Sequence, residues 1–417
     1  MTLLNRAECS ALRGIAIIGI FLHNYLHWLG PMVKENEYQF HQHNAERFWY
    51  ILTHPDENLI YHLFSFFGHY GVPVFVFLSG YGLYLKYESG QFGMRNEKLG
   101  IRNEKLGTAE SWIGGVWSFM KSHYNKLFPM MFLGFVAFAM VDWLTPGRHH
   151  WTWDAIIEQL TMTINLFPDP DHRIWPGPYW FFGLMMELYL VYRLLLYRRH
   201  WGWNVGLIIC CMAIQALCWN DPEGDAINRI RYNFMGNMLP FGMGLLVARV
   251  QGVQEVQEVQ KVQGVQKVQE VQGVQEAQGV QKVQGVQEKT LNFKLSARPE
   301  GALAIARTLN FIIAVAAIIS LSFNFWTWLI IPLFVVIAHI GFIKMLSSMP
   351  AGEILVKGLA WVGGISAAIF VCHPITRKIF IPISRSGDIL DGLVIYIIAT
   401  IMLAMIFKKM LEARGKR

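Results

Sequence analysis

Long apolar runs, separated by shorter polar stretches, dominate the hydrophobic pattern of this chain. About 20 mostly apolar residues in a helix are enough to cross the ~30 Å hydrocarbon core of a bilayer. The pattern therefore predicts an all-α fold, a polytopic transmembrane helical bundle of about ten spans. The expected spans are residues 11–30, 63–85, 128–144, 177–197, 204–219, 232–249, 303–322, 325–343, 355–375 and 389–407.

Composition and charge agree with a membrane protein. Hydrophobic residues make up 53% of the 417 residues and charged residues only 16%, whereas soluble domains carry about a quarter charged residues. Lys and Arg gather in the segments that face the cytoplasm if both termini lie there, except in the loop after the ninth span, where Arg377, Lys378 and Arg385 would face outward. This distribution accounts for the net charge of +7 without nucleic acid as a partner. We expect the lipid bilayer as a partner and the inner, cytoplasmic membrane of the cell as the location.

The predicted spans fall into two parts joined by a linker. Residues 1–249 hold the first six spans and include an expanded cytoplasmic loop at 87–116, in which RNEKLG occurs twice, and residues 301–417 hold the last four spans. Residues 250–300 begin with thirteen consecutive V-Q-G/E/K triplets, with one alanine replacing a valine. A three-residue period matches neither the 3.6-residue helix nor the two-residue strand. We therefore expect a cytoplasmic low-complexity linker without a core or chemistry of its own.

Cysteine and histidine spacing does not indicate a disulfide framework or a metal. The five cysteines show no C-x-x-C pair and lie mostly in apolar runs, which favours small buried side chains. In the outer loops, His41 and His43 lack a further ligand at a suitable spacing. The outer loops are also rich in Trp, which is typical of the interfacial belt of membrane proteins, although stacking on a saccharide is the functional alternative. We expect no metal.

The first span carries ionisable residues that are costly in a bilayer. Arg13 lies near its start, and His23 and His27 lie near its end. At 1.5 Å rise per residue, Arg13 and His23 are about 15 Å apart. One interpretation is that Arg13 extends to the inner headgroups and the histidines lie at the outer interface. The other is a ligand-binding cation at one end and a proton-handling imidazole at the other, because ionisable groups inside a span tend to face a site.

Three later spans add further candidates. The second span contains the run Gly71–Gly80, which includes Ser79 and whose small residues are typical of close helix packing. The fourth span contains Glu187, an isolated carboxylate that must pair, take up a proton or face water. The ninth span ends with His373 directly before Pro374.

Together these stretches resemble the acyltransferase 3 family of integral-membrane O-acyltransferases. Members of that family open with an L-R-G-x-A span that ends in histidine, continue with a G-V-x-x-F-F-x-L-S-G span and a W-F-L-x-x-E-x-x-x-Y span, and close with an aromatic-x-x-His-x-P-type span. The corresponding residues here are Leu12–Gly14 with His23, Gly71–Gly80, Trp180–Tyr189 and Phe370–Pro374. Their order covers nearly the whole chain outside the two repeat segments.

The resemblance implies an activity and a set of roles. The activity is transfer of an acyl group, usually acetyl, from cytoplasmic acyl-CoA to a hydroxyl of an extracytoplasmic or lipid-linked saccharide. Arg13 would bind the phosphates or the pantetheine arm of the donor, since a guanidinium matches phosphate oxygens. His23 would deprotonate the acceptor hydroxyl or relay the acyl group. Ser79 and Tyr189 would shape the donor tunnel, and His373 would assist from the outer side.

Two departures from the family pattern leave roles open. Family members usually place ten residues between the arginine and the histidine, whereas nine separate Arg13 from His23. Eleven steps along a helix return to within about 20° of the same face, but ten steps fall about 80° away. The catalytic imidazole is therefore either His23, on a locally distorted helix, or His27. Glu187 comes two residues later than the family's first glutamate, which leaves its catalytic role open.

Proteins of other classes could share some of these features. A transporter or flippase of a lipid-linked glycan also needs a polar interior, but transporters often contain inverted repeats, and the two halves of this chain show no repeated hydropathy pattern. Haem held by His23 and His62 is a third possibility, with no further feature in its favour. We therefore expect the enzyme.

Overall fold

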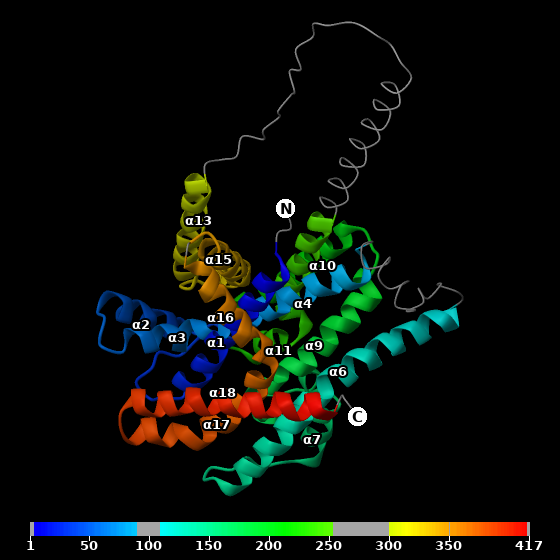
Figure 1. Ribbon diagram of the computed structural model, residues 1–417. Coiled ribbons are helices and arrows are strands. Elements are labelled where there is room, and N and C mark those ends of the chain that lie inside the picture. The colour runs from blue at the N-terminus through cyan, green and yellow to red at the C-terminus, as the bar shows by residue number, and fades with distance from the viewer. Residues whose placement is uncertain (1–3, 90–108, 253–299, 350, 415–417) are drawn as a thin grey trace, which may run out of the picture.

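The protein is all-helical. The computed structural model describes residues 4–89, 109–252, 300–349 and 351–414, and these residues form helices and connecting turns without a strand (Figure 1). Within them, seven helical segments are long and apolar enough to cross a membrane, and two shorter apolar helices accompany them. The seven are Arg6–Leu26, Leu59–Tyr87, Gly114–Leu144, Gly177–Leu196, Trp201–Asn220, Ser366–Ser386 and Ile389–Ala413. The predicted all-α membrane bundle is confirmed; the side on which the termini lie stays a prediction.

The first helix, α1 (Arg6–Leu26), is packed on several sides. A capping box begins it: the Asn5 side chain accepts the Glu8 backbone N–H, and the Glu8 carboxylate accepts the Asn5 backbone N–H, both at 2.8 Å. Among the helices that contact α1 are α3 (Leu59–Phe67), α4 (Gly71–Tyr87), α15 (Ile331–Leu346), α16 (Gly352–Gly364) and α17 (Ser366–Ser386). Side chains that project from α1 are therefore held by elements from both ends of the chain.

A pair of glycines lets α1 and α16 touch. A Cβ added to Gly14 would lie 1.9 Å from the carbonyl oxygen of Leu359, and one added to Gly363 would lie 1.8 Å from the carbonyl oxygen of Ser10. No side chain fits at either position, so glycine is what permits this backbone-to-backbone approach.

The second predicted span is divided by a tight turn. Between α3 and α4 the chain forms a 3₁₀ turn, Gly68–Tyr70. A Cβ on Gly68 would lie 2.6 Å from the Cβ of His23, and one on Gly71 would lie 2.2 Å from the carbonyl oxygen of Ala16. The turn therefore lies where the chain presses against α1 beside His23.

The far end of α4 packs in the same way on a helix that covers residues 234–252. A Cβ on Gly80 would lie 2.2 Å from the carbonyl oxygen of Phe241, and one on Gly244 would lie 2.1 Å from that of Phe77. The small residues of the run Gly71–Gly80 thus serve helix packing on both sides of α4.

The third span is longer than its apolar run. The prediction began it at residue 128 and assigned residues up to 116 to a loop, but α6 covers Ala109–Leu144. The residues before Phe128 include Lys121 and Lys126, so the helix begins before its sequence becomes apolar. The helix also continues through Pro129.

The middle spans agree with the prediction to within a few residues. A 3₁₀ turn, η3 (Gly177–Tyr179), leads into α9 (Trp180–Val191), which ends in a π-helical turn, η4 (Tyr192–Leu196). The next helix is α10 (Trp201–Ala216), extended by the 3₁₀ turn η5 (Leu217–Asn220).

The ninth predicted span, 355–375, is wrong as a single helix. The chain breaks at Ile365, directly after Gly363 and Gly364, and forms α16 and α17 instead. Because α17 runs on to Ser386 through two prolines, Arg377 and Lys378 lie inside a helix and not in an outward loop. The other helices of this part are α13 (Glu300–Leu321), α14 (Phe325–Trp328), α15 (Ile331–Leu346) and α18 (Ile389–Arg414).

Three helix pairs that include the C-terminal elements lie side by side in Figure 1: α1 with α16, α13 with α15, and α17 with α18. Shorter helices complete the fold, and they are α2 (Gln42–Thr53), α7 (Trp153–Leu160), η2 (Ile164–Leu166), α8 (Pro170–Arg173) and α11 (Asp225–Tyr232). The RNEKLG repeat and all but the first triplet of the V-Q repeat lie outside the described residues; that first triplet ends the helix 234–252.

Candidate active site

A cavity of about 290 Å³ lies at the C-terminal end of α1. Ile20, His23, Asn24 and His27 line it, a spacing of three, four and seven residues that places all four side chains on one face of the helix. α1 is helical throughout Arg6–Leu26, so His23 reaches the cavity without a break in the helix. Both histidines that the sequence left as alternatives therefore face the same cavity, with ring centroids 4.7 Å apart.

The His23 ring is held in one orientation. It is 2% exposed, and its Nδ1 lies 2.8 Å from the carbonyl oxygen of Ser65, beside the turn after α3. Because a carbonyl can only accept, Nδ1 donates, and a neutral ring keeps its lone pair on Nε2. That atom lies 3.9 Å from a carboxylate oxygen of Glu35 and 3.9 Å from one of Glu37.

The two carboxylates come from the segment between α1 and α2, outside the membrane spans. Glu35 also approaches Nδ1 of His27 at 3.0 Å. Burial alone would raise the pKa of Glu35, but His27, whose Nδ1 lies beside the carboxylate, holds it below its usual range. Burial and the neighbouring charge of Glu35 raise the pKa of Glu37 to about 8. At neutral pH the site therefore holds one anionic and one protonated carboxyl group.

A third imidazole lies beside the first two. His69, from the 3₁₀ turn before α4, is 4% exposed and has its ring centroid 5.4 Å from that of His23. Within the part of the chain that the structure describes, neither of its ring nitrogens has a hydrogen-bond partner. Buried polar atoms without a protein partner are rare, so these nitrogens are available to bind a ligand.

An aromatic wall closes one side of the cavity. Tyr38 stacks on Tyr232 with centroids 3.9 Å apart and planes 6° apart, and Trp180 meets both rings edge-on. The Tyr232 hydroxyl donates to a carboxylate oxygen of Asp171 at 2.7 Å, and the Asn228 amide donates to the other at 2.7 Å. Tyr38, Asp171 and Tyr232 come from connections between the long helices, and Trp180 begins α9, so connecting segments and one span build this wall together.

A buried carboxylate positions another ring of the wall, Trp175. Asp142 of α6 is fully buried and accepts the indole N–H of Trp175 at 3.3 Å and that of Trp151 at 3.0 Å. The ammonium group of Lys378, on α17, pairs with the same carboxylate. This network ties α6, the following loop and α17 together behind the cavity.

Arg377 is the cation of the cavity wall. It lies on α17, its guanidinium is 5.0 Å from the Trp28 ring centroid, and its Nη1 donates to the carbonyl oxygen of Asn24 at 3.3 Å. The break at Ile365 that the sequence did not predict is what makes this residue part of a helix beside α1.

Arg13, Ser79 and Tyr189, which the sequence assigned to the donor, gather near the other end of α1. Ser79 and Arg13 both lie close enough to Tyr189 to influence its hydroxyl group. Arg13 is exposed on α1. His123 of α6 joins this group, with its ring centroid 4.4 Å from that of Tyr189.

The structure does not bring Glu187 and His373 into the cavity wall. One carboxylate oxygen of Glu187 accepts the backbone N–H of Phe234 at 2.9 Å, so this side chain caps the helix 234–252. His373 is fully buried behind the wall residue Phe370, its Nδ1 lies 3.2 Å from the carbonyl oxygen of Ile369, and its Nε2 has no hydrogen-bond partner. Catalytic roles for both stay predictions.

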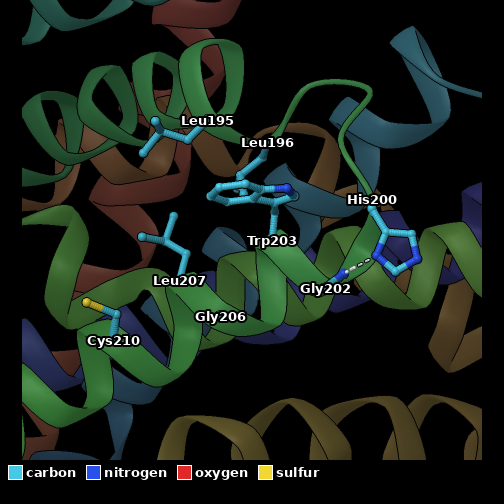
Figure 2. Close-up of a pocket in the computed structure, with 8 residues that line it drawn as sticks. All are labelled: Leu195, Leu196, His200, Gly202, Trp203, Gly206, Leu207 and Cys210. Carbon is cyan, nitrogen blue, oxygen red and sulfur yellow. Dashed lines mark hydrogen bonds between the residues drawn. The ribbon is translucent and has the colours of Figure 1, made fainter.

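A larger cavity, of about 530 Å³, lies between the end of η4 and α10 (Figure 2). Leu195, Leu196, Trp203 and Leu207 give it apolar walls. Its histidine, His200, accepts the backbone N–H of Gly202 at 3.1 Å. None of the predicted site residues lines this cavity, and its lining offers apolar surface without an acid–base pair.

Several site residues were missed by the sequence analysis. Glu35 and Glu37 follow the first span closely, and this proximity is a signal that could have been used. His69, in the turn that divides the second predicted span, was given no role from the sequence. Asp171 and Tyr232 are far from His23 in the chain and could not have been joined to it without the fold.

A buried imidazole beside carboxylates, inside an all-helical bundle, defines a membrane-embedded protein equipped for acid–base chemistry. The family model of an acyltransferase domain matches residues 7–409. The protein thus belongs to the acyltransferase 3 family and is a membrane acyltransferase, as the motif order predicted. Comparisons with curated proteins and with solved structures found no match.

Proposed function

We propose that this enzyme transfers an acyl group, acetyl in the first instance, from cytoplasmic acyl-CoA to a saccharide hydroxyl on the outer side of the inner membrane or on a lipid-linked glycan. The observation that carries the proposal is the orientation of His23. Its Nδ1 is committed to the Ser65 carbonyl, and its Nε2 faces a cavity beside two carboxylates.

The proposed reaction uses Nε2 of His23 as a general base. It takes the proton of the acceptor hydroxyl while the hydroxyl oxygen attacks the thioester carbonyl carbon. The ester C–O bond forms and the C–S bond breaks, and the proton passes from the imidazolium to the leaving CoA thiolate. The Glu35 carboxylate, 3.9 Å from Nε2, stabilises the imidazolium that forms in between.

The geometry favours His23 over His27 as the base. His27 directs Nδ1 at Glu35 at 3.0 Å and is partly exposed, whereas His23 is buried and oriented by a backbone carbonyl. A base that is held in place needs less reorganisation in the transition state. His27 then helps to position Glu35.

The other end of α1 supports the donor assignment. Arg13 lies about 15 Å from His23 along α1, at the helical rise per residue, a length that the extended pantetheine arm of CoA can span. Arg13 is exposed and can offer a forked cation to the phosphates of the donor. The thioester would then reach His23 from the side opposite to the acceptor.

The aromatic wall supports a saccharide acceptor. Stacked Tyr38 and Tyr232, with Trp180 and Trp175, present ring faces and polar edges, while Asp171 and Glu37 add carboxyl groups. Sugars have apolar C–H faces and hydroxyl edges, so such a wall matches both.

The test is the mass of the surface glycan in a strain that lacks the gene, complemented with wild type or with His23→Ala. We expect one ester-linked acyl mass to be present with wild type and lost with His23→Ala. Retention of the acyl ester with His23→Ala would contradict the assignment of the base. Disappearance of the whole glycan from the surface would favour transport over acylation.

A further inference from the structure

His23, His27 and Glu35 each offer one atom that could bind a metal ion, and these three atoms lie within 4.8 Å of one another. Two of these separations are known individually: Glu35 Oε1 is 3.0 Å from His27 Nδ1 and 3.9 Å from His23 Nε2. In a tetrahedral zinc site with bonds of about 2.0–2.1 Å, ligand atoms are roughly 3.3 Å apart. The Glu35–His27 separation is slightly shorter than this spacing, the Glu35–His23 separation is about 0.6 Å longer, and the third separation is at most 4.8 Å.

The surroundings of these side chains also fit a metal site. The Ser65 carbonyl accepts from Nδ1 of His23 at 2.8 Å, which is the usual way in which a backbone group orients a ligating imidazole. Among the residues that the structure describes, the second oxygen of Glu35 and both ring nitrogens of the buried His69 have no hydrogen-bond partner. Unpaired polar atoms beside converging ligand atoms are groups that a bound cation or its water ligands could satisfy.

His23, His27 and Glu35 were not predicted as a metal site from the sequence. Only His41 and His43 were considered as metal ligands there, and they lacked a third ligand at a suitable spacing. His23 and His27, however, are four residues apart on one face of α1, a spacing at which two histidines can bind one zinc ion. Glu35 follows after the helix ends, so only the fold shows that it returns to the pair.

We propose that His23, His27 and Glu35 bind one divalent transition-metal ion of the Zn²⁺ class, and that the bound ion inhibits acyl transfer. The inhibition rests on the proposed function: a metal on Nε2 of His23 occupies the lone pair that would accept the acceptor's proton. The cation of the cavity wall does not prevent binding, because the Arg377 guanidinium is directed at Trp28 and at the Asn24 carbonyl.

The structure supplies a control. His41, His43 and Glu223 form a second group of potential ligands, in which His41 Nδ1 lies 3.2 Å from Glu223 Oε2. This group is more exposed than His23, His27 and Glu35, because His43 and Glu223 are exposed and only His41 is half-buried. Glu223→Gln therefore serves as the matched substitution for Glu35→Gln.

Binding is measured first, on the full chain in detergent after treatment with a chelator, by calorimetric titration with ZnCl₂. We expect one tight site that Glu35→Gln and His27→Ala each weaken about tenfold or more, and that Glu223→Gln leaves unchanged. Titration of the wild type with CoCl₂ keeps the test independent of variant folding: visible absorption bands of a four- or five-coordinate site should appear and be abolished by Zn²⁺. Absence of these bands, or loss of tight binding with Glu223→Gln alone, would overturn the proposal.

Activity is measured second, as acyl transfer by wild-type membranes with added ZnCl₂ or with chelator. We expect transfer to fall with Zn²⁺ and to recover with the chelator. Transfer that needs Zn²⁺ and stops with the chelator would overturn the inhibition. Tight binding without any acyl transfer under either condition would instead count against the proposed function while supporting the metal site.

Discussion

The reactivity of this site depends on the Nε2 atom of His23. The ring is buried, and the Ser65 carbonyl occupies its other nitrogen. Glu35 and Glu37 face Nε2 at the same distance, but only Glu35 is anionic at neutral pH, because the two share one desolvated space. The carboxylate of Glu35 stabilises the imidazolium that forms on His23 during the transfer, and the protonated Glu37 remains able to donate a hydrogen bond.

Glu37 should make stability depend on pH. Its pKa is about 8 in the folded protein against an ordinary value of 4.5, so the unfolded chain releases a proton that the folded protein keeps. The folded state therefore loses stability as pH rises from about 4.5 to about 8. Glu37→Gln removes this pH-dependent loss of stability. We therefore expect the melting temperature of Glu37→Gln to exceed that of wild type by roughly 2 °C or more at pH 8.5, and by much less at pH 5.

The measurement is a thermal melt in detergent at both pH values. A constant difference between Glu37→Gln and wild type across this pH range would show that Glu37 does not titrate as described.

Arg13 tests the donor end. Loss of a charged hydrogen bond costs ~1.5–3 kcal/mol, so Arg13→Ala should raise KM for acyl-CoA by about tenfold or more while kcat changes less. The assay is initial rate against donor concentration, with Arg307→Ala as control, because that arginine bonds Ser348 between α13 and α15. Unimpaired turnover of Arg13→Ala at low donor concentration would remove Arg13 from the donor site.

At the scale of the elements, the site depends on close contact between helices. α1 touches α16 through Gly14 and Gly363, and the turn before α4 touches α1 through Gly68. These contacts bring Ser65 and His69 to His23. A change that separates the helices should therefore act on the site without touching its residues.

Gly14→Ala and Gly363→Ala test this packing. Each added Cβ would meet a carbonyl oxygen at less than 2 Å, and we expect a loss of about 1–3 kcal/mol, seen as a lower melting temperature and a smaller folded yield. Gly358→Ala is the matched control on α16, because nothing lies within 4 Å of its added Cβ. It should be neutral or slightly stabilising, since alanine favours a helix over glycine by roughly 0.5–1 kcal/mol. Equal melting temperatures for the three variants would contradict the account.

At the scale of the whole molecule, apolar periodicity was sufficient to predict the all-α membrane bundle, and motif order was sufficient to predict the family. Periodicity could not find the break at Ile365, because residues 355–375 are apolar on both sides of it. It also missed the start of α6, where lysines interrupt a helix that packing sustains. The wall around His23 needs Asp171, Tyr232 and Arg377 from three distant segments, and a single sequence has no signal that pairs them.

The sequence also could not identify the hydrogen-bond partners of Glu187 and His373. Sequence reasoning correctly marks a buried carboxylate or imidazole as needing a partner, but it does not say which partner. The fold supplies a helix N-terminus for Glu187 and a backbone carbonyl for His373. The sequence also assigned Arg13, Ser79 and Tyr189 to one group at the donor, and that role stays a prediction.

The central claim is that the cavity around His23 is where the acyl group meets its acceptor. In the most direct measurement, membranes that carry the protein are incubated with the native glycan and with acetyl-CoA that is labelled in its acetyl group. The alkali-labile label on the glycan is then counted. His23→Gln is compared with wild type and with His339→Gln, a membrane-helix histidine whose ring bonds the Val335 carbonyl on its own helix, α15. The account predicts label with wild type and His339→Gln and a loss of about 100-fold or more with His23→Gln. Wild-type labelling by His23→Gln would contradict it.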